Sequence, residues 1–94
     1  METAESIASH LLEIKLIACA NIFPAGTSIY KWEGKIKKES EIYFILKTNK
    51  KLFKQVKEEI LKIHPYDCPA IVEINVDNTH LPFTHWVKEQ TKIT

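Results

Sequence analysis

Residues 18–48 read ACANIFPAGTSIYKWEGKIKKESEIYFILKT, and this stretch predicts one long β-hairpin. Its second arm contains Ile42–Leu46, a short apolar run rich in residues that favour strands. Its first arm contains the similarly β-rich Thr27–Trp32, and a polar connection from Gly34 to Ser40 lies between them. Because a small domain cannot cover arms of this length with its own helices, we expect part of the hairpin to form a subunit interface.

Composition bounds the remaining possibilities. Ninety-four residues support a single domain spanning 1–94, and a net charge of +1 gives no general attraction to nucleic acid or to an acidic membrane. No window is apolar enough to span a bilayer, and the acidic start Met1–Glu5 does not resemble a signal peptide. Two cysteines outside any CxxC pair favour reduced thiols and a cytoplasmic protein.

The helices and the remaining strands follow from periodicity and from turn residues. Apolar residues recur at helical spacing in the first part of the chain, and proline or glycine interrupts the regular segments that follow. We therefore predict helices at Glu2–Leu16, Lys50–Ile63 and Leu81–Thr91, strands at Ala18–Phe23 and Ala70–Val76, and a bend at Pro24–Gly26.

This element order indicates an α+β fold of the ferredoxin-like type, in which a split β-α-β-β-α-β unit forms one antiparallel sheet. The sequence begins directly at the first helix, so the first strand of that order is lacking. In the complete fold that strand is central and separates Ile42–Leu46 from Ala70–Val76. We therefore expect Met1 to be internal to a longer protein.

Three motifs now support a resemblance to a known family. The segments TSIYKWEGKI, ILKT and HPYDCPAIVEI, which begin at residues 27, 45 and 64, resemble the CutA divalent-cation tolerance proteins, as does IKLIACANIFP from residue 14. The resemblance covers nearly the whole chain. It implies a ferredoxin-like fold, assembly into homotrimers through the long hairpins, an architecture similar to that of PII signalling proteins, and a role in tolerance to divalent metals, above all copper.

The sequence departs from the family pattern at places that concern metal binding. The missing first strand carries the position at which the family has a copper-binding cysteine. Ala70 stands where the family commonly has a glutamate. Of the metal-binding residues that the resemblance implies, only His64 keeps its place. We therefore expect weak binding of Cu(II) or another divalent metal through His64, and no other cofactor.

Residues 64–69, HPYDCP, are the part of the chain whose side chains are best suited to metal binding or catalysis. An imidazole, a carboxylate and a thiol lie close together, and each can bind a transition metal. The spacing matches no established zinc or copper signature. Structural roles are the alternative: His64 at the helix end, Tyr66 between subunits and Cys68 as a buried thiol.

The other histidines and the other cysteine offer weaker candidates for a metal site. His80 and His85 do not share a helical face, so they are not expected to bind one metal together. Cys19 is expected to be a small buried hydrophobic residue.

The second candidate site lies at the expected subunit cleft. The resemblance implies roles there for Lys47, Tyr66, Trp32, Glu33 and Lys35. Lys47 ends an apolar strand, where a buried ammonium needs a carboxylate or a ligand. Glu33 or Glu41 is a candidate carboxylate, and an ion pair between subunits is the simplest interpretation. A more specific interpretation, by analogy with PII proteins, is that Lys47 lines a pocket for a small anionic ligand.

These observations predict a cytoplasmic, non-enzymatic, homotrimeric CutA-like protein that responds to divalent metals, without a nucleic-acid or membrane partner. A PII-like sensor with its ligand in the subunit cleft is the first alternative. A small enzyme on a ferredoxin-like scaffold is the second. It is disfavoured because no base–nucleophile pair is evident and Gly26 and Gly34 form no phosphate-binding loop.

Overall fold

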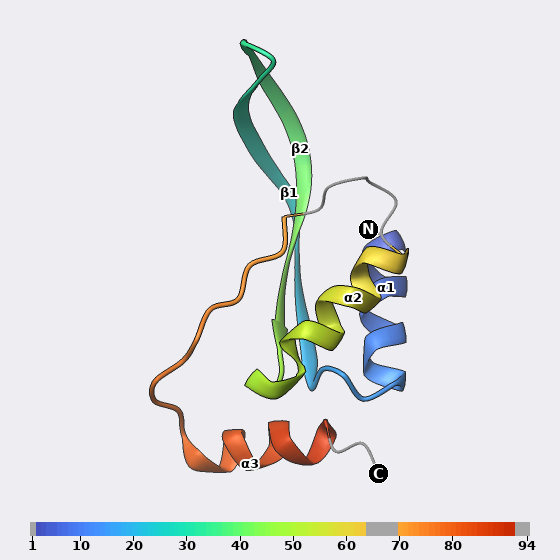
Figure 1. Cartoon of the computed structure of the whole chain (residues 1–94), viewed down its shortest axis with the longest axis vertical. Helices are drawn as coiled ribbons and strands as arrows, with labels where there is room; N and C mark the ends of the chain where they lie inside the picture. The colour runs from blue at the N-terminus through green and yellow to red at the C-terminus, as the bar shows by residue number, and fades with distance from the viewer. Residues whose placement is uncertain (1, 64–69, 92–94) are drawn as a thin grey trace.

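The computed structural model describes residues 2–63 and 70–91. A helical body occupies one end of the molecule, and a two-stranded hairpin extends far beyond it (Figure 1). The described elements are, in chain order, α1 (Glu2–Glu13), β1 (Cys19–Trp32), β2 (Lys35–Lys47), the 3₁₀ turn η1 (Lys50–Leu52), α2 (Phe53–Ile63) and α3 (Leu81–Gln90).

The turn of the hairpin is shorter than the sequence suggested. Glu33 and Gly34 alone connect the strands, with φ angles of 51° and 78°. Two successive residues with positive φ are characteristic of a type I′ turn, whose twist matches that of the flanking strands. Residues 35–40, which we expected in a polar connection, are therefore the first part of β2, and Trp32 pairs with Lys35. The predicted long hairpin is confirmed, but its predicted connection from Gly34 to Ser40 is wrong.

A bulge interrupts the first strand at the predicted bend. Phe23 pairs with Tyr43, whereas Gly26 pairs with Glu41, so two residues of β1 lie opposite the single residue Ile42. Such an insertion bends the strand and increases its twist locally. Pro24 is suited to the bulge because it cannot donate to the ladder of backbone hydrogen bonds.

Helix α1 ends at Glu13, earlier than predicted, in a Schellman motif. The backbone N–H of Leu16 donates to the carbonyl of Leu11 at 3.0 Å, and that of Lys15 donates to Leu12 at 3.1 Å. Lys15 takes the left-handed conformation, with a φ angle of 61°, where glycine is the usual residue. The chain then reverses so that Leu16 packs back onto Leu11, and both are buried.

The second helical segment begins as predicted at Lys50, with Asn49 as its cap. The Asn49 side chain accepts a hydrogen bond from the backbone N–H of Lys51 at 3.1 Å. The neighbouring Thr48 donates its hydroxyl hydrogen to the carbonyl of Leu16 at 2.6 Å. This bond joins the end of β2 to the loop after α1.

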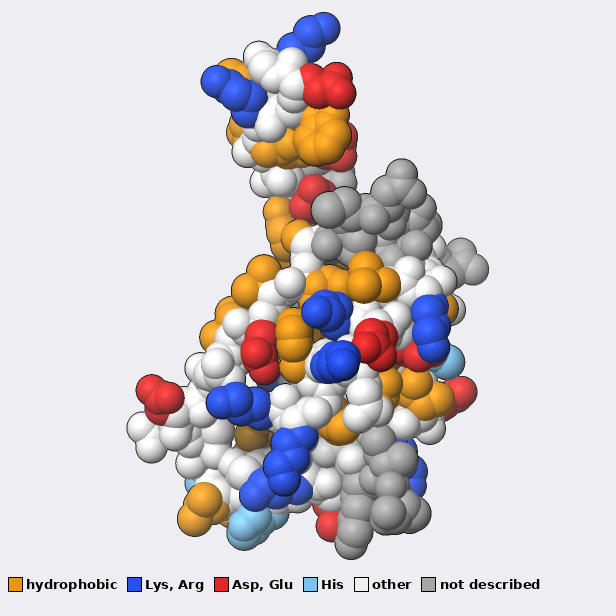
Figure 2. Space-filling model, in the orientation of Figure 1, with side chains coloured by type: hydrophobic (Ala, Val, Ile, Leu, Met, Phe, Trp, Pro, Cys, Tyr) orange, Lys and Arg blue, Asp and Glu red, His pale blue; other side chains and the backbone are white. Residues whose placement is uncertain are grey.

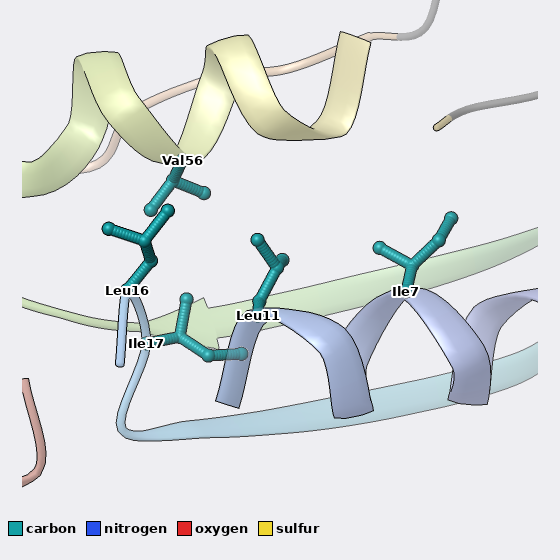
Figure 3. Packing of buried hydrophobic residues seen from close by; sticks show 5 residues of the cluster. All are labelled: Ile7, Leu11, Leu16, Ile17 and Val56. Carbon is teal, nitrogen blue, oxygen red and sulfur yellow. The ribbon is translucent and has the colours of Figure 1, made fainter. Parts of the chain in front are cut away.

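The hydrophobic core lies between α1, α2 and one face of the hairpin (Figure 3). It consists of residues from both helices and from the loop after α1: Ile7, Leu11, Leu16, Ile17 and Val56. Phe44 and Leu46 of β2 pack against this cluster from the sheet. Because side chains alternate along a strand, Tyr43 and Ile45 point to the opposite face, where they are 44% and 52% exposed.

The predicted strand Ala70–Val76 is not a strand in the structure. The segment runs beside β2 as an irregular extended trace, and the described part of the sheet contains only β1 and β2 (Figure 1). A strand needs a neighbour for its backbone hydrogen bonds. In the ferredoxin-like order this segment would pair with the first strand, and the described residues contain no strand at that position. Alternation along residues 70–76 produces a strand only where such a neighbour is present.

Helix α3 follows this segment and closes the lower end of the molecule (Figure 1). It begins at Leu81, as predicted, and Pro82 lies in its first turn. Its last turn is completed by Thr91, whose hydroxyl donates to the carbonyl of Val87 at 2.8 Å. Val87 is buried, whereas Trp86 is 43% exposed.

Candidate functional site

The outer half of the hairpin, residues 26–41, carries apolar side chains on both faces and is called the arm below. The register places Ile29 and Ile36 on the face that continues from Phe44 and Leu46. Tyr30 and Trp32 lie on the other face. Ile36 is 76% exposed, Ile29 66% and Trp32 60%, and Figure 2 shows orange side chains on the arm well beyond the helical body.

One side-chain hydrogen bond joins the two strands of the arm and leaves its apolar surface exposed. The Tyr30 hydroxyl donates to Glu39 Oε1 at 2.9 Å across the two strands. The pKa of Tyr30 is raised above its ordinary value, mainly because of this hydrogen bond to Glu39. An apolar surface left open on both faces of a strand pair is unusual for a monomer and typical of an interaction surface.

Lys47 lies at the opposite end of β2, beside α3. Its ammonium nitrogen is 5.7 Å from the centroid of the Phe83 ring, which is a cation–π contact. Neither Glu33 nor Glu41 forms an ion pair with Lys47 within the described chain, where the ion pairs join His10 and Lys62 to Glu59. Sequence reasoning missed Phe83, because its contact with Lys47 comes from a distant helix.

The residues predicted for the cleft do not converge within one chain. Trp32, Glu33 and Lys35 lie together at the tip of the arm. Lys35 and Lys47 are the first and last of the 13 residues of β2, so roughly 40 Å of strand lies between them. A site that contains both groups therefore requires the tip of one subunit to reach the Lys47 end of another.

The predicted metal ligand His64 lies outside the described residues, as do Tyr66 and Cys68. Among residues 2–63 and 70–91, no three His, Cys, Asp or Glu side chains are grouped so that they could hold a metal ion. His80 precedes α3 and His85 lies within it. Cys19 is a free thiol of intermediate burial, so it is less buried than we expected.

A groove of about 1620 Å³ separates β2 from the segment 70–76. Side chains of α1 and α2 line its floor, namely Ala4, Ile7, Val56 and Ile60. Residues 41–48 form one wall and residues 70–76 the other. Lys47, Lys50 and Lys88 line the same groove, and α3 lies at the end where β2 finishes (Figure 1).

The described part of the chain contains no helix long and apolar enough to cross a membrane.

Comparison with known proteins places this chain in a family. A model of the family described as CutA1 divalent ion tolerance protein matches residues 1–90. The divalent-cation tolerance protein CutA of Pyrococcus horikoshii is 44% identical over 91 residues, which are 97% of this chain and 88% of that protein. The chain belongs to the CutA1 divalent ion tolerance family.

Solved structures show the same fold. The structure of the periplasmic divalent cation tolerance protein CutA from Archaeoglobus fulgidus matches with a TM-score of 0.94 at 40% identity, covering 98% of this chain and 89% of that one. The apo structure of the PII-like protein CutA from Nostoc sp. PCC 7120 matches with a TM-score of 0.89 at 34% identity, covering 99% and 90%. These matches confirm the predicted α+β, ferredoxin-like fold class.

Proposed function

We propose that this chain acts as a homotrimeric CutA protein in the tolerance of divalent metal ions, copper in particular. Membership of the divalent ion tolerance family carries the general role. The arm supports the assembly, because Ile29 and Ile36 on one face and Tyr30 and Trp32 on the other would both be covered if each arm inserted between neighbouring subunits. Aromatic residues are favoured at the buried centre of such interfaces.

Sedimentation or mass photometry tests this assembly directly. The expected mass is about three times the 10.9 kDa of the chain. A folded monomer at micromolar concentration would contradict the proposal, because the arm would then remain exposed to water.

We also propose that the trimer binds Cu(II) through His64, weakly and at one histidine per subunit. Of the metal-binding residues that the resemblance to the family implies, His64 alone keeps its place in this sequence. Imidazole is a suitable ligand for Cu(II). Symmetry then brings three copies of the imidazole to related positions if His64 lies near the threefold axis.

Calorimetry with Cu(II) on the trimer distinguishes the possible ligands. His64→Ala should abolish the binding, whereas His85→Ala, a histidine change of the same kind on α3, should leave it unchanged. Tight binding that survives His64→Ala but not His85→Ala would place the metal elsewhere. The proposed role is non-enzymatic and cytoplasmic, and fractionation of cells that express the natural protein tests the location.

A small-ligand sensor is the second candidate. Its support is the likeness to the Nostoc protein described as PII-like, together with Lys47 at the end of β2. If the tip of a neighbouring arm brings Lys35 close to Lys47, two ammonium groups would face one cleft and attract an anion. A thermal-shift screen of anionic metabolites tests this, since a ligand that binds only the folded trimer raises its stability. Loss of the shift in Lys47→Met would support the cleft.

A further inference from the structure

One face of α2 points away from the core and carries positive charge. The opposite side of the helix buries Val56 and packs Ile60 against the core. Lys54, Lys57 and Leu61 follow one another at spacings of three and four residues, so they share a face of the helix, and all three are exposed. α2 crosses the helical body in Figure 1, and Figure 2, in the same orientation, shows blue side chains in that region.

The charge pattern of this face does not stabilise the helix itself. Lys50 lies one turn before Lys54, and the first turns of η1 and α2 contain no acidic residue. Positive charge at this end of a helix opposes the macrodipole, and like charges three or four residues apart repel. No ion pair joins Lys50, Lys54 or Lys57 to another described residue. Carboxylates from a partner would remove both unfavourable interactions.

One lysine of this face is held by an aromatic ring. The ammonium nitrogen of Lys57 lies 5.8 Å from the centroid of the Phe53 ring, which is a cation–π contact. The contact restricts a long side chain that remains exposed, so less conformational entropy is lost when a partner binds it. Leu61 follows one turn later and is 52% exposed, which gives the face an apolar end.

The size and chemistry of this face favour an acidic protein segment over nucleic acid. The distance along the helix from Lys50 to Leu61 is roughly 16 Å, and Glu58 and Glu59 lie on the same helix, where they would repel a phosphate backbone. The chain contains no arginine, the residue that binds two phosphate oxygens at once. Carboxylates one helical turn apart match the three-residue spacing of Lys54 and Lys57.

We propose that the stripe formed by Lys50, Lys54, Lys57 and Leu61 is a docking surface for an acidic amphipathic helix of a partner protein. Two carboxylates of that helix, one turn apart, pair with Lys54 and Lys57, and an apolar residue one turn beyond them packs on Leu61. Because the lysines are exposed, salt weakens the attraction. The stripe belongs to the helical body and not to the arm, so docking does not require a change in assembly.

A synthetic helix tests the surface on the full 94-residue chain. The probe is a fluorescein-labelled, acetylated and amidated alanine-rich peptide of roughly 15 residues. It carries two glutamates three residues apart, with a leucine four residues before the first and another four residues after the second. The control peptide has the same composition but carries its glutamates on opposite faces. Fluorescence polarisation at low ionic strength should show saturable binding of the probe and several-fold weaker binding of the control. Binding of the probe should weaken as salt is raised to about 0.15 M.

Matched variants locate the binding on α2. The Lys54→Gln, Lys57→Gln double variant should bind the probe roughly fivefold more weakly at low salt, as expected for the loss of two exposed charge pairs. The Lys15→Gln, Lys62→Gln double variant removes the same charge from other parts of the helical body. It should bind the probe as the wild type does.

Charge reversal separates docking from any loss of folding. The Lys54→Glu, Lys57→Glu variant should no longer bind the glutamate probe, but it should bind a peptide of the same design with lysine in place of glutamate. The wild type should show the opposite preference. Leu61→Ser should weaken binding of the probe, whereas Leu12→Ser, at a 42% exposed site on α1, should not. Each variant should keep the wild-type mass in sedimentation.

Several results would overturn the proposal. Equal binding of the probe and the control peptide would do so, as would wild-type affinity in the Lys54→Gln, Lys57→Gln variant. Tighter binding of an oligothymidylate strand or of phosphatidylserine vesicles, with the same dependence on these two lysines, would assign the surface to nucleic acid or to a membrane instead. Absence of binding to the glutamate probe at low salt would also overturn it.

Discussion

The Tyr43 ring lies directly over the backbone of Gly26, at the bulge where the hairpin leaves the helical body. A Cβ atom built on Gly26 would overlap this ring. Tyr43 pairs with Phe23 on one side of the bulge, and Gly26 pairs with Glu41 on the other. An aromatic side chain that covers a glycine is a known way to pin the register of a bent strand. The absence of a side chain at residue 26 thus allows the ring to close over the bend.

Gly26→Ala should destabilise the protein by about 1 kcal/mol, because the new methyl group displaces the Tyr43 ring from its place. Urea unfolding of the wild type, Gly26→Ala, Tyr43→Ala and the double variant measures this coupling. In the Tyr43→Ala background the change at residue 26 should cost much less. Equal costs in both backgrounds would show that the ring does not occupy the space over Gly26.

Lys15 provides a second test of backbone geometry. A residue with a side chain in the left-handed conformation is strained by roughly 1–2 kcal/mol relative to the ordinary helical one, and Lys15 has a φ angle of 61°. Lys15→Gly should therefore stabilise the protein by about 0.5–1 kcal/mol. Lys15→Ala removes the same charge but keeps the Cβ atom, so it should give no such gain. A thermal or urea comparison of the two variants separates backbone strain from charge.

The contact between His10 of α1 and Glu59 of α2 should make stability depend on acid. The His10 ring nitrogen Nε2 lies 2.8 Å from Glu59 Oε1. This hydrogen bond, with a smaller contribution from Lys62, lowers the pKa of Glu59 below its ordinary value of 4.5. Because the folded-state pKa is the lower one, the contribution is complete above pH 4.5 and is lost as the pH falls through the folded-state pKa.

Glu59→Gln should therefore lower stability at neutral pH and leave it nearly unchanged well below pH 4.5. Urea unfolding at both pH values and at one protein concentration measures the difference. Glu58→Gln on the same helix is the matched control, since no ion pair joins Glu58 to another described residue. A pH dependence that is the same in both variants would assign the acid sensitivity to other carboxylates.

Local signals predicted the helices and the hairpin well. The helical spacing of apolar residues predicted α1, and Ile7 and Leu11, which belong to that pattern, are both buried. The end of α1 was missed because Lys15 takes a conformation that glycine usually marks. The turn at Glu33 was missed for a similar reason, since the charged residues after Gly34 are typical of a loop.

Features that depend on distant parts of the chain were harder to predict. Residues 70–76 alternate as a strand does, but a strand also needs a neighbour, and alternation carries no information about that neighbour. The position of Lys47 at the end of a strand was predicted, whereas its contact with Phe83 depends on where α3 packs. The separation of Trp32 from Lys47 follows from the length of β2, which was underestimated when its first residues were assigned to a loop.

The core between the helices should respond strongly to the loss of one side chain. Leu11 is fully buried, whereas its neighbour Leu12 is 42% exposed. Leu11→Ala should cost about 2–5 kcal/mol, because it removes apolar contacts and leaves a cavity between α1 and α2. Leu12→Ala makes the same chemical change on the same helix and should cost less than about 1 kcal/mol. Similar losses in both variants would contradict the packing in Figure 3.

The arm should control assembly rather than the stability of the helical body. Trp32 and Ile36 are 60% and 76% exposed in the single chain, so lysine at both positions removes little packing within it. In a trimer both side chains would be buried, and truncating such central residues typically costs about 2 kcal/mol or more each. The Trp32→Lys, Ile36→Lys double variant should therefore sediment well below three times 10.9 kDa at micromolar concentration. Leu61→Lys, at a 52% exposed site on α2, should keep the wild-type mass. An unchanged mass in the double variant would mean that the subunits associate through another surface.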